Sequence, residues 1–314
     1  MRIGIIGLGN MGLRRFLLLR NIGYDGPVFG YDINPRRLEM LPRDLTRVDS
    51  LPAFWRYRPD IVFVSTPPDV HLPMIEEAAR HDARAVFVEK PLSIEDPGVL
   101  PEFGQTRVMV GCNTRYHEGI NAIERWRSYN RIGLITHATM SANYDVADVR
   151  SDWRDSYIAR TGAILDAGIH FLDLARWWFG NGQVVEADIV TEHGIETASS
   201  FVVEYSGIPV HYSVNIRAAP VDQSVIVAGQ AATACYEWSA HRTTLCSSDA
   251  RRLATHSWPN AADALYRAYV AEMNAFLDLA QHGGNNPNNP AFAADTVRLA
   301  LSVRAAARAT AQIV

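Results

Sequence analysis

Short apolar runs alternate with amphipathic stretches over the first third of the chain. Several of these runs are apolar at every position, which is typical of strands whose sheet is covered on both faces. Strand and helix patterns that alternate in this way predict an α/β fold with a doubly wound parallel sheet. The predicted strands are 2–6, 28–31, 46–48, 61–65, 85–89 and 108–111, and the predicted helices are 11–21, 35–41, 72–81 and 95–103.

The pattern changes after about residue 113, where strand-like segments follow one another with short turns. Strands in series predict a large, open and mostly antiparallel sheet, so this part is expected to be α+β. We therefore expect two domains, at residues 1–113 and 114–314. The predicted strands are 184–191, 200–205, 210–216, 224–228, 233–238 and 243–246, after a long Thr- and Ala-rich run at 134–144. The predicted helices are 119–129, 163–179, 264–281 and 291–311, with a loop at 283–290.

Composition and charge exclude several classes of protein. The chain has 314 residues, of which 48% are hydrophobic and 20% charged, and its net charge is −4. Scattered basic residues on a negative chain give no electrostatic case for nucleic acid or an anionic membrane as a partner. Three widely spaced cysteines offer neither a metal site nor a disulfide framework. Because the first strand begins at once and no long apolar run exists, we expect no leader, no membrane span and a cytoplasmic protein.

A glycine motif lies between the first predicted strand and the first predicted helix. Its glycines permit a tight turn, close approach of the backbone to a pyrophosphate, and close packing of the helix on the strand. The amides at the start of the helix can then receive the phosphate charge. Asp32 ends the second strand, where its carboxylate can accept hydrogen bonds from the adenosine ribose. We therefore predict a dinucleotide site with contacts from Gly7, Gly9, Asn10, Met11, Gly12, Asp32 and Arg37.

The choice between NAD and NADP depends on charges at the same corner. Asp32 would repel a 2′-phosphate, which favours NAD. Arg36 and Arg37 lie within reach and could accept that phosphate if Asp32 turned away, so NADP stays possible. Alternatively, the two arginines form only the solvated start of a helix.

Further cofactor contacts are expected where the next strands end. In a doubly wound sheet, loops at the carboxyl ends of the strands line the ligand crevice. The same pattern also fits an ordinary strand-to-helix turn, and a lone histidine is more often a capping or exposed residue. The residues concerned are Ser65, Thr66, Pro67, His71, Glu89 and Lys90.

Three polar residues supply the chemistry of hydride transfer at an alcohol. Lys90 places an ammonium directly after a buried strand, and Asp166 and His170 are four residues apart, which is one face of a helix. Asp173 continues that face and fits a supporting role. The competing interpretation is a helix with a buried, hydrogen-bonded histidine and flanking salt bridges.

Taken together, these motifs resemble the glucose–fructose oxidoreductase and inositol dehydrogenase (Gfo/Idh/MocA) family over essentially the whole chain. The resemblance implies an N-terminal Rossmann domain and a C-terminal α+β domain whose open sheet often forms an oligomer interface. It also implies that Lys90, Asp166 and His170 occupy the catalytic positions. The motifs are the glycine loop 7–12, Asp32, Ser65-Thr66-Pro67, Glu89-Lys90-Pro91-Leu92, Asn113-x-Arg115-Tyr116 and residues 162–173.

In those positions His170 is the candidate general base, because a neutral imidazole accepts a proton near pH 7. Lys90 would stabilise the developing charge on oxygen, and Asp166 would orient either group. The expected substrate contacts are Lys90, Arg115, Tyr116, Trp153, Arg154, Asp166 and His170. Trp153 and Arg154 fit surface packing equally well.

Two departures from the family pattern concern the shape of the substrate pocket. The glycine run before the Asp-His helix is reduced to Thr161-Gly162-Ala163, and Glu118 stands where a proline is often found.

The expected function is NAD(P)-dependent oxidation or reduction at a secondary alcohol or ketone of a sugar, sugar derivative or cyclitol. The expected partners are this polyhydroxylated small molecule and further copies of the chain, as a homodimer or homotetramer. Two alternatives stay open. One is redox elimination at a glycosidic bond without net cofactor turnover, and the other is a non-catalytic dinucleotide sensor.

Overall fold

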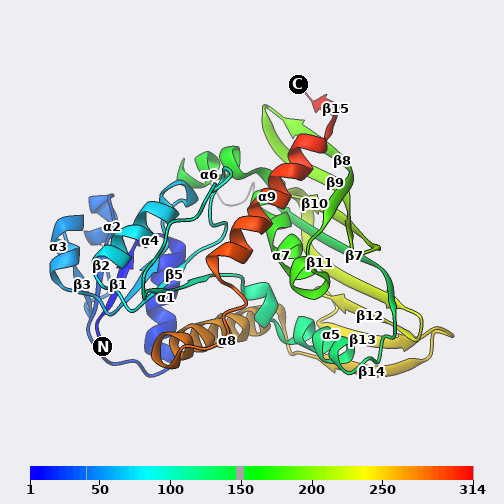
Figure 1. Cartoon of the computed structure of the whole chain (residues 1–314), viewed down its shortest axis with the longest axis horizontal. Helices are drawn as coiled ribbons and strands as arrows, with labels where there is room; N and C mark the ends of the chain where they lie inside the picture. The colour runs from blue at the N-terminus through cyan, green and yellow to red at the C-terminus, as the bar shows by residue number, and fades with distance from the viewer. Residues whose placement is uncertain (40, 146–151, 314) are drawn as a thin grey trace. The chain divides into compact units, whose positions relative to one another are not determined.

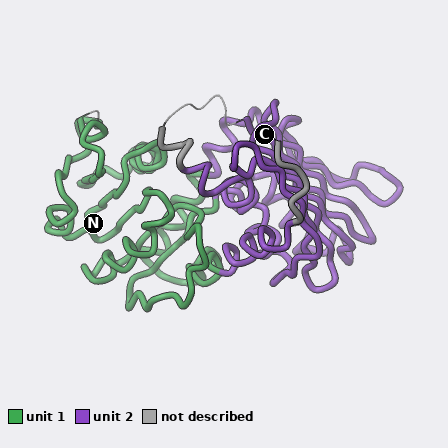
Figure 2. The backbone as a smooth tube through the Cα atoms, turned by 90° about the horizontal axis from the view of Figure 1, so that it is seen from above, with its two compact units in different colours: residues 1–112, 269–294 green, residues 113–268, 295–314 purple. Residues whose placement is uncertain are grey.

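The computed structural model describes residues 1–39, 41–145 and 152–313, with the backbone alone for 152–156 and 308–313. Contacts divide the chain into two compact units, coloured separately in Figure 2. The first unit contains Met1–Cys112 and Tyr269–Ala294, and the second contains Asn113–Ala268 and Asp295–Val314. The division predicted at residue 113 thus differs for Tyr269–Ala294, which return to the first unit.

The first unit is built on a parallel sheet of six described strands in the order β3-β2-β1-β4-β5-β6 (Figure 1). Every residue of β1, β4 and β5 is buried, so both faces of the sheet are covered, as the apolar runs predicted. The strands are β1 (Ile3–Ile6), β2 (Val28–Tyr31), β3 (Leu45–Arg47), β4 (Ile61–Val64), β5 (Ala85–Val88) and β6 (Arg107–Val110). The helices are α1 (Asn10–Asn21), α2 (Pro35–Glu39), α3 (Leu51–Arg56), the 3₁₀-helix η1 (Pro68–Val70) and α4 (His71–Arg80).

The chain returns to this unit through the second half of α8 (Ala261–His282). The Phe276 ring packs against Phe63 and Phe87, with ring centroids 5.2 and 5.3 Å apart. The following connector lies along edge strand β6, where the Val110 amide donates to the Asn288 carbonyl at 2.8 Å. This apolar contact and the paired edge explain why residues far along the chain belong to the first unit.

A buried guanidinium joins three segments of the same unit. Arg15, on α1, is 1% exposed, and its Nε donates to Glu89 Oε1 at 2.7 Å. Its Nη1 donates to Glu272 Oε2, on α8, at 2.8 Å. The guanidinium also stacks over the Phe87 ring, 4.2 Å from its centroid. Burial outweighs the attraction of Arg15 and raises the pKa of Glu272 to about 7.

The second unit is built on a sheet of nine described strands in the order β14-β13-β12-β11-β7-β10-β9-β8-β15. Most neighbours are antiparallel, while β7 pairs with β10 and β8 pairs with β15 in parallel. The strands are β7 (Ile135–Asp145), β8 (Gln183–Glu192), β9 (Ile195–Tyr205), β10 (Ile208–Asn215), β11 (Arg217–Gly229), β12 (Ala232–Glu237), β13 (Arg242–Ser247), β14 (Arg252–Ser257) and β15 (Arg308–Ile313). The predicted fold class, a parallel sheet followed by an α+β part, is therefore confirmed.

Helices α5 and α7 pack on one face of this large sheet (Figure 1). Alternate residues such as Met140 on β7, Tyr212 on β10 and Val225 on β11 are buried there. The helical segments of this unit are η2 (Asn113–Tyr116), α5 (Glu118–Ser128), α6 (Asp152–Ala163), the π-helix η4 (Ile164–Gly168), α7 (Ile169–Phe179) and most of α9 (Pro290–Ala306).

Two predicted helices differ from the structure, and some elements of the structure were not predicted. Residues 95–103 form turns without a helix, because Pro97, Gly98 and Pro101 interrupt the backbone pattern that a helix needs. The last helix ends at Ala306, and β15 follows where helix was predicted to continue to residue 311. Strand β14 and helices α3 and α6 were not predicted. Within the described ranges, no helix has the length and apolar character needed to cross a membrane.

Glu272→Gln tests the cost of the buried carboxylate. Since the pKa of Glu272 is about 7 in the folded chain and its ordinary value is 4.5, the folded protein retains a proton that the unfolded chain loses in that window. The free energy of unfolding should therefore fall as the pH rises from 4.5 to about 7, and glutamine should remove that fall. Urea unfolding at pH 5 and pH 8 measures the difference.

The matched control is Glu124→Gln, since Glu124 pairs with Arg127 on the surface of α5. This variant should keep the wild-type dependence on pH. A Glu272→Gln protein with the same dependence as wild type would show that Glu272 is ionised at neutral pH in the folded chain.

Candidate dinucleotide and catalytic site

The loop between β1 and α1 depends on two glycines that no other residue can replace without movement. Gly7 has φ +86°, and a Cβ there would lie 2.6 Å from the Ser65 carbonyl oxygen. A Cβ on Gly12 would lie 1.9 Å from the Gly7 carbonyl oxygen. The first contact seats the loop against the end of β4, and the second lets α1 pack closely on β1.

Gly9 differs from these two because the space above it is open to a ligand. A Cβ there would meet only Arg37, whose Nη1 would lie 3.6 Å away. Gly9 is the N-cap of α1 and supplies no side-chain acceptor to the first turn, which also contains no acidic residue. The first-turn amides, including those of the exposed Asn10 and half-buried Met11, therefore suit a phosphate anion.

Asp32 is held firmly at the end of β2. Its Oδ2 accepts from the Leu8 amide at 2.7 Å and from Arg37 Nη1 at 3.1 Å, while its Oδ1 accepts from the Asn34 amide at 2.8 Å. The carboxylate is 2% exposed. Turning Asp32 away would leave the buried Leu8 amide without its acceptor, so the arrangement in which Arg37 replaces it is costly.

Two buried hydroxyls, on residues whose backbone adjoins Gly7, have no partner in the described chain. They are Ser65 Oγ and Thr66 Oγ1, which follow β4 beside Gly7. Buried hydroxyls normally form hydrogen bonds, so these two suit the polar groups of a bound ligand. With the open cradle at Gly9 and the fixed Asp32, the residues of this unit fit a dinucleotide.

His71 was predicted to contact the cofactor, which stays a prediction, and its alternatives were a capping or exposed histidine. It is fully buried at the start of α4, and burial lowers its pKa. Its Nε2 lies 2.8 Å from the Thr66 carbonyl oxygen and its Nδ1 lies 2.9 Å from the Pro91 carbonyl oxygen. The ring thus joins the loop after β4 to the loop after β5, instead of capping a helix or lying exposed.

Lys90 stands between two anchored neighbours. Glu89 before it accepts from the buried Arg15, and Pro91 after it contacts His71. The Lys90–Pro91 peptide bond is cis. Lys90 itself is half-buried. One oxygen of the Glu89 carboxylate is thus engaged by Arg15.

In the second unit, Glu196 on β9 supports the start of the segment that carries Asp166 and His170. Its Oε1 accepts from the Ile164 amide at 2.5 Å, and its Oε2 accepts from Arg304 Nε at 2.8 Å. Gly162 has φ +56°, and a Cβ there would lie 2.7 Å from Glu196 Cβ. This single glycine lets the chain pass close to Glu196, so the reduced glycine run retains the residue that the turn requires.

Asp166 lies in a π-helical turn and His170 in the first turn of α7, where a continuous α-helix was predicted. From 161 to 170 these two side chains are half-exposed and every other residue is buried. The structure therefore places an acid and an imidazole at the open side of an otherwise buried segment. A π-turn of this kind is frequent at functional sites.

Two consecutive residues of η2 hold α7 from the side. Thr114 Oγ1 lies 3.1 Å from His170 Nδ1. Arg115 is 3% exposed, and its Nε and Nη2 donate to the two oxygens of Asp173 at 2.6 and 2.8 Å. Arg115 was predicted to contact substrate, but the structure buries its guanidinium in this bidentate pair. Asp173 takes the supporting role expected of it.

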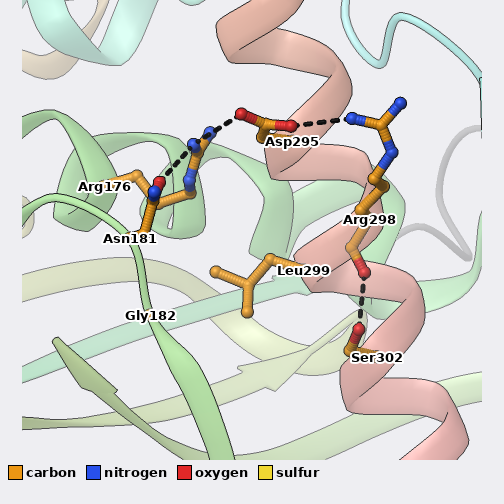
Figure 3. A pocket seen from close by; sticks show the side chains of 7 residues that line it. All are labelled: Arg176, Asn181, Gly182, Asp295, Arg298, Leu299 and Ser302. Atoms are coloured by element: carbon orange, nitrogen blue, oxygen red, sulfur yellow. Dashed lines mark hydrogen bonds and ion pairs between the residues drawn. The ribbon is translucent and has the colours of Figure 1, made fainter. Parts of the chain in front are cut away.

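Further along α7, Arg176 is anchored to α9. Arg176 and Arg298 lie on either side of Asp295, whose oxygens are 3.3 and 2.7 Å from them (Figure 3). Arg176 also donates to Thr296 Oγ1 at 2.8 Å and to Asn181 Oδ1 at 3.0 Å. A shallow hollow of about 290 Å³ lies here. The charged groups that line this hollow pair with one another, so we interpret them as structural contacts that hold α7 to α9.

The remaining predicted positions are less informative about substrate. Tyr116 ends η2 and is half-buried. The backbones of Trp153 and Arg154 lie in α6, and their side chains are outside the described residues. Glu118 is the first residue of α5, where proline also fits, and it pairs with Arg267 at 2.5 Å. In the described chain, no three His, Cys, Asp or Glu side chains gather as metal ligands.

Sequence reasoning missed Arg15, Thr114 and Glu196. Arg15 and Glu196 find their partners across distances of 74, 257, 32 and 108 residues, which no local pattern reveals. Thr114 was the unassigned position of the Asn113-x-Arg115 motif, and its nearness to that motif was the one available signal.

Comparison with known proteins agrees with this description. The family profile described as "Oxidoreductase family, NAD-binding Rossmann fold" matches residues 1–100, and the profile described as "GFO/IDH/MocA C-terminal domain" matches residues 120–235. The first unit is thus an NAD-binding Rossmann domain and the protein is an NAD(P)-dependent oxidoreductase. The chain belongs to the Gfo/Idh/MocA family. A search of the curated proteins gave no match.

Solved structures with the same fold extend over nearly the whole chain. An oxidoreductase from Agrobacterium radiobacter, in complex with NAD+, L-tartaric acid and magnesium, is 18% identical, with TM-score 0.81 and coverage of 98% of this chain and 96% of that one. UDP-N-acetylglucosamine 3-dehydrogenase from Acidithiobacillus ferrooxidans is 20% identical, with TM-score 0.81 and coverage of 98% and 97%. A 3-ketoreductase from Actinomadura kijaniata, in complex with TDP-benzene and NADP, is 19% identical, with TM-score 0.76 and coverage of 98% of both chains.

Gly9→Ala and Gly12→Ala separate ligand contact from folding. Because a Cβ at residue 9 meets only the Arg37 side chain, Gly9→Ala should keep the wild-type unfolding midpoint and weaken NAD binding by about tenfold or more. Gly12→Ala should lower both the unfolding midpoint and the affinity for NAD, since its Cβ clashes with the loop backbone. Urea unfolding and titration of protein fluorescence with NAD measure the two effects. Gly9→Ala binding NAD as tightly as wild type would remove the phosphate cradle from residue 9.

Proposed function

We propose that the protein transfers a hydride between nicotinamide and a secondary alcohol or ketone carbon of a polyhydroxylated substrate. The observation that carries the proposal is the half-exposed Asp166 and His170 on an otherwise buried segment. Buried groups surround them with fixed supports, as catalytic side chains require. Lys90, half-buried after β5 of the first unit, is the third residue to which we assign a role.

Each of the three side chains has a separate task in this mechanism. The bound nicotinamide supplies or accepts the hydride. In the oxidation direction, His170 accepts the hydroxyl proton as the C–H bond breaks, and in reduction it returns that proton. The Lys90 ammonium stabilises the negative charge that develops on the same oxygen. Asp166 orients the imidazole and accepts a hydrogen bond from a neighbouring hydroxyl of the substrate.

The substrate class follows from the chemistry that the proposed site offers. An ammonium, an imidazole and a carboxylate together can bind several hydroxyl groups at once, which suits a sugar, a sugar derivative or a cyclitol. Two proteins with the same fold carry names that point the same way, UDP-N-acetylglucosamine 3-dehydrogenase and a 3-ketoreductase crystallised with TDP-benzene. The third was crystallised with L-tartaric acid, another compound with adjacent hydroxyl groups.

NAD is the cofactor that we propose for the physiological reaction. The Asp32 carboxylate is fixed by two backbone amides at the corner where the adenosine ribose of a Rossmann domain binds. A 2′-phosphate placed there would face that buried negative charge. The adjacent Arg37 offsets part of the repulsion, so NADP is expected as a weaker cofactor.

Lys90→Met and His170→Asn test the catalytic assignment with side chains of similar size. Each variant should lower kcat by at least about a hundredfold, because proton transfer or charge stabilisation is lost, while NAD affinity stays within about threefold of wild type. The measurement is reduced nicotinamide absorbance with a panel of inositols, hexoses and amino sugars, plus NAD titration. His211→Asn, an exposed histidine on β10, is the control.

Wild-type turnover in either variant would exclude its residue from the chemistry. The same panel decides between function classes. Product formed without net change in the cofactor would indicate redox elimination, and NAD binding without any turnover would indicate a sensor.

Asp32→Asn tests the cofactor preference. Asparagine keeps an oxygen that accepts from the Leu8 amide but removes the negative charge, so a 2′-phosphate is repelled less. The ratio of kcat/KM with NAD to that with NADP should fall by about tenfold. Arg36→Gln, on the same exposed corner, should change the ratio less. An unchanged ratio in Asp32→Asn would mean that the carboxylate does not face the ribose.

A further inference from the structure

The Thr114 hydroxyl contacts the His170 ring. The hydroxyl lies 3.1 Å from Nδ1, on the side of the ring opposite Nε2. Thr114 is half-buried and belongs to η2, not to the helix that carries His170. A residue outside the helix therefore contacts one of the two ring nitrogens of His170.

The neighbouring ion pair fixes this contact in place. Arg115 follows Thr114 and donates two hydrogen bonds to Asp173, one turn beyond His170. The guanidinium also lies over the Trp177 ring, 5.2 Å from its centroid. Two adjacent residues of η2 thus contact His170 and Asp173 of α7, which are three residues apart and share a face of the helix. Neither the short segment η2 nor the first turn of α7 can rotate without breaking a buried bidentate pair.

The position of the hydroxyl matters because a neutral imidazole carries a single N–H. Its proton lies on Nδ1 or on Nε2, and only the other nitrogen can accept a proton. A threonine hydroxyl can accept a hydrogen bond from Nδ1–H. When it does, Nε2 is the ring nitrogen that carries the lone pair.

We propose that Thr114 is a positioning residue that holds His170 in its Nδ1–H tautomer and aims Nε2 at the substrate hydroxyl. This inference rests on the proposed role of His170 as the general base. In the oxidation step the substrate O–H bond breaks, its proton binds Nε2, and the hydride leaves carbon for the nicotinamide. The imidazolium that forms keeps its Nδ1–H donated to Thr114, so the same hydroxyl supports the base before and after the transfer.

Charged groups around His170 affect the same equilibrium and must stay constant in a test. Those described in its own unit are Asp166 one turn before it, Asp173 one turn after it, and Arg115 and Arg176, of which Arg115 pairs with Asp173. A substitution confined to the Thr114 hydroxyl leaves all four in place.

Thr114→Val and Thr114→Ser form the test, because valine keeps the shape without the hydroxyl and serine keeps the hydroxyl. Thr114→Val should lower kcat by about ten- to a hundredfold with little change in KM. The acid limb of the pH profile for oxidation should move down by about 0.5–1 pH unit, since the imidazolium loses a stronger hydrogen bond than the neutral ring. Thr114→Ser should restore kcat to within about threefold of wild type and return the limb to its place.

A spectroscopic readout does not depend on turnover. In protein labelled with ¹⁵N-histidine, the His170 signals, assigned by their loss in His170→Asn, should show a protonated Nδ1 in the neutral form of wild type. Thr114→Val should shift them toward a mixture of tautomers. A His170 that is protonated on Nε2 in wild type would overturn the proposal.

Two kinetic results would also overturn the proposal. One is a Thr114→Val protein with wild-type kcat and an unchanged acid limb of the pH profile, and the other is a loss of kcat in Thr114→Val that Thr114→Ser does not restore. These results are distinct from failure of the proposed function, which shows as full turnover in His170→Asn. In that case the tautomer measurement still decides the Thr114 contact by itself.

Discussion

The first unit depends on the buried ion pairs that Arg15 forms with Glu89 and Glu272. A guanidinium that is 1% exposed must be neutralised within the protein, and two carboxylates from distant segments do so. Glu89 ties α1 to the end of β5, and Glu272 brings the second half of α8 onto the same sheet. The helix that presents amides to a dinucleotide, the strand that precedes Lys90 and the returning chain are therefore held by a single side chain.

The second unit also contains buried arginines that pair with carboxylates from other segments. Asp166 and His170 are half-exposed, yet helix α7, which carries His170, is fixed by the buried Arg115–Asp173 pair and by Arg176. In both units a buried arginine holds the backbone near a side chain to which we assign a catalytic role. Burying these charges costs free energy, but the ion pairs that result fix the backbone beside Lys90 and beside His170.

Much of the fold could be predicted from sequence because its signals are local. Strands β1, β4 and β5 are apolar at every position, and the glycine loop is read directly from its spacing. The family assignment was confirmed by profiles that match both parts of the chain. The roles of Lys90, Asp166 and His170 stay predictions, and the last two are both half-exposed in the structure.

What could not be predicted depends on contacts between distant residues. Nothing near Arg115 indicates that its guanidinium is occupied by Asp173, 58 residues away. Nothing near His71 indicates that it is buried between two carbonyl groups. The π-turn at Ile164–Gly168 arises where Glu196 and Gly162 set the start of the helix, so a helical period alone could not show it.

The return of Tyr269–Ala294 to the first unit has a consequence for how the protein is made. A ribosome releases the chain in order, so β1 to β6 leave it long before Phe276 and Glu272 do. Until then, the aromatic surface of Phe63 and Phe87 lacks its cover and Arg15 lacks its second carboxylate. Residues 1–112 can begin to fold early, but the unit is completed only when residues 269–294 have also been synthesised.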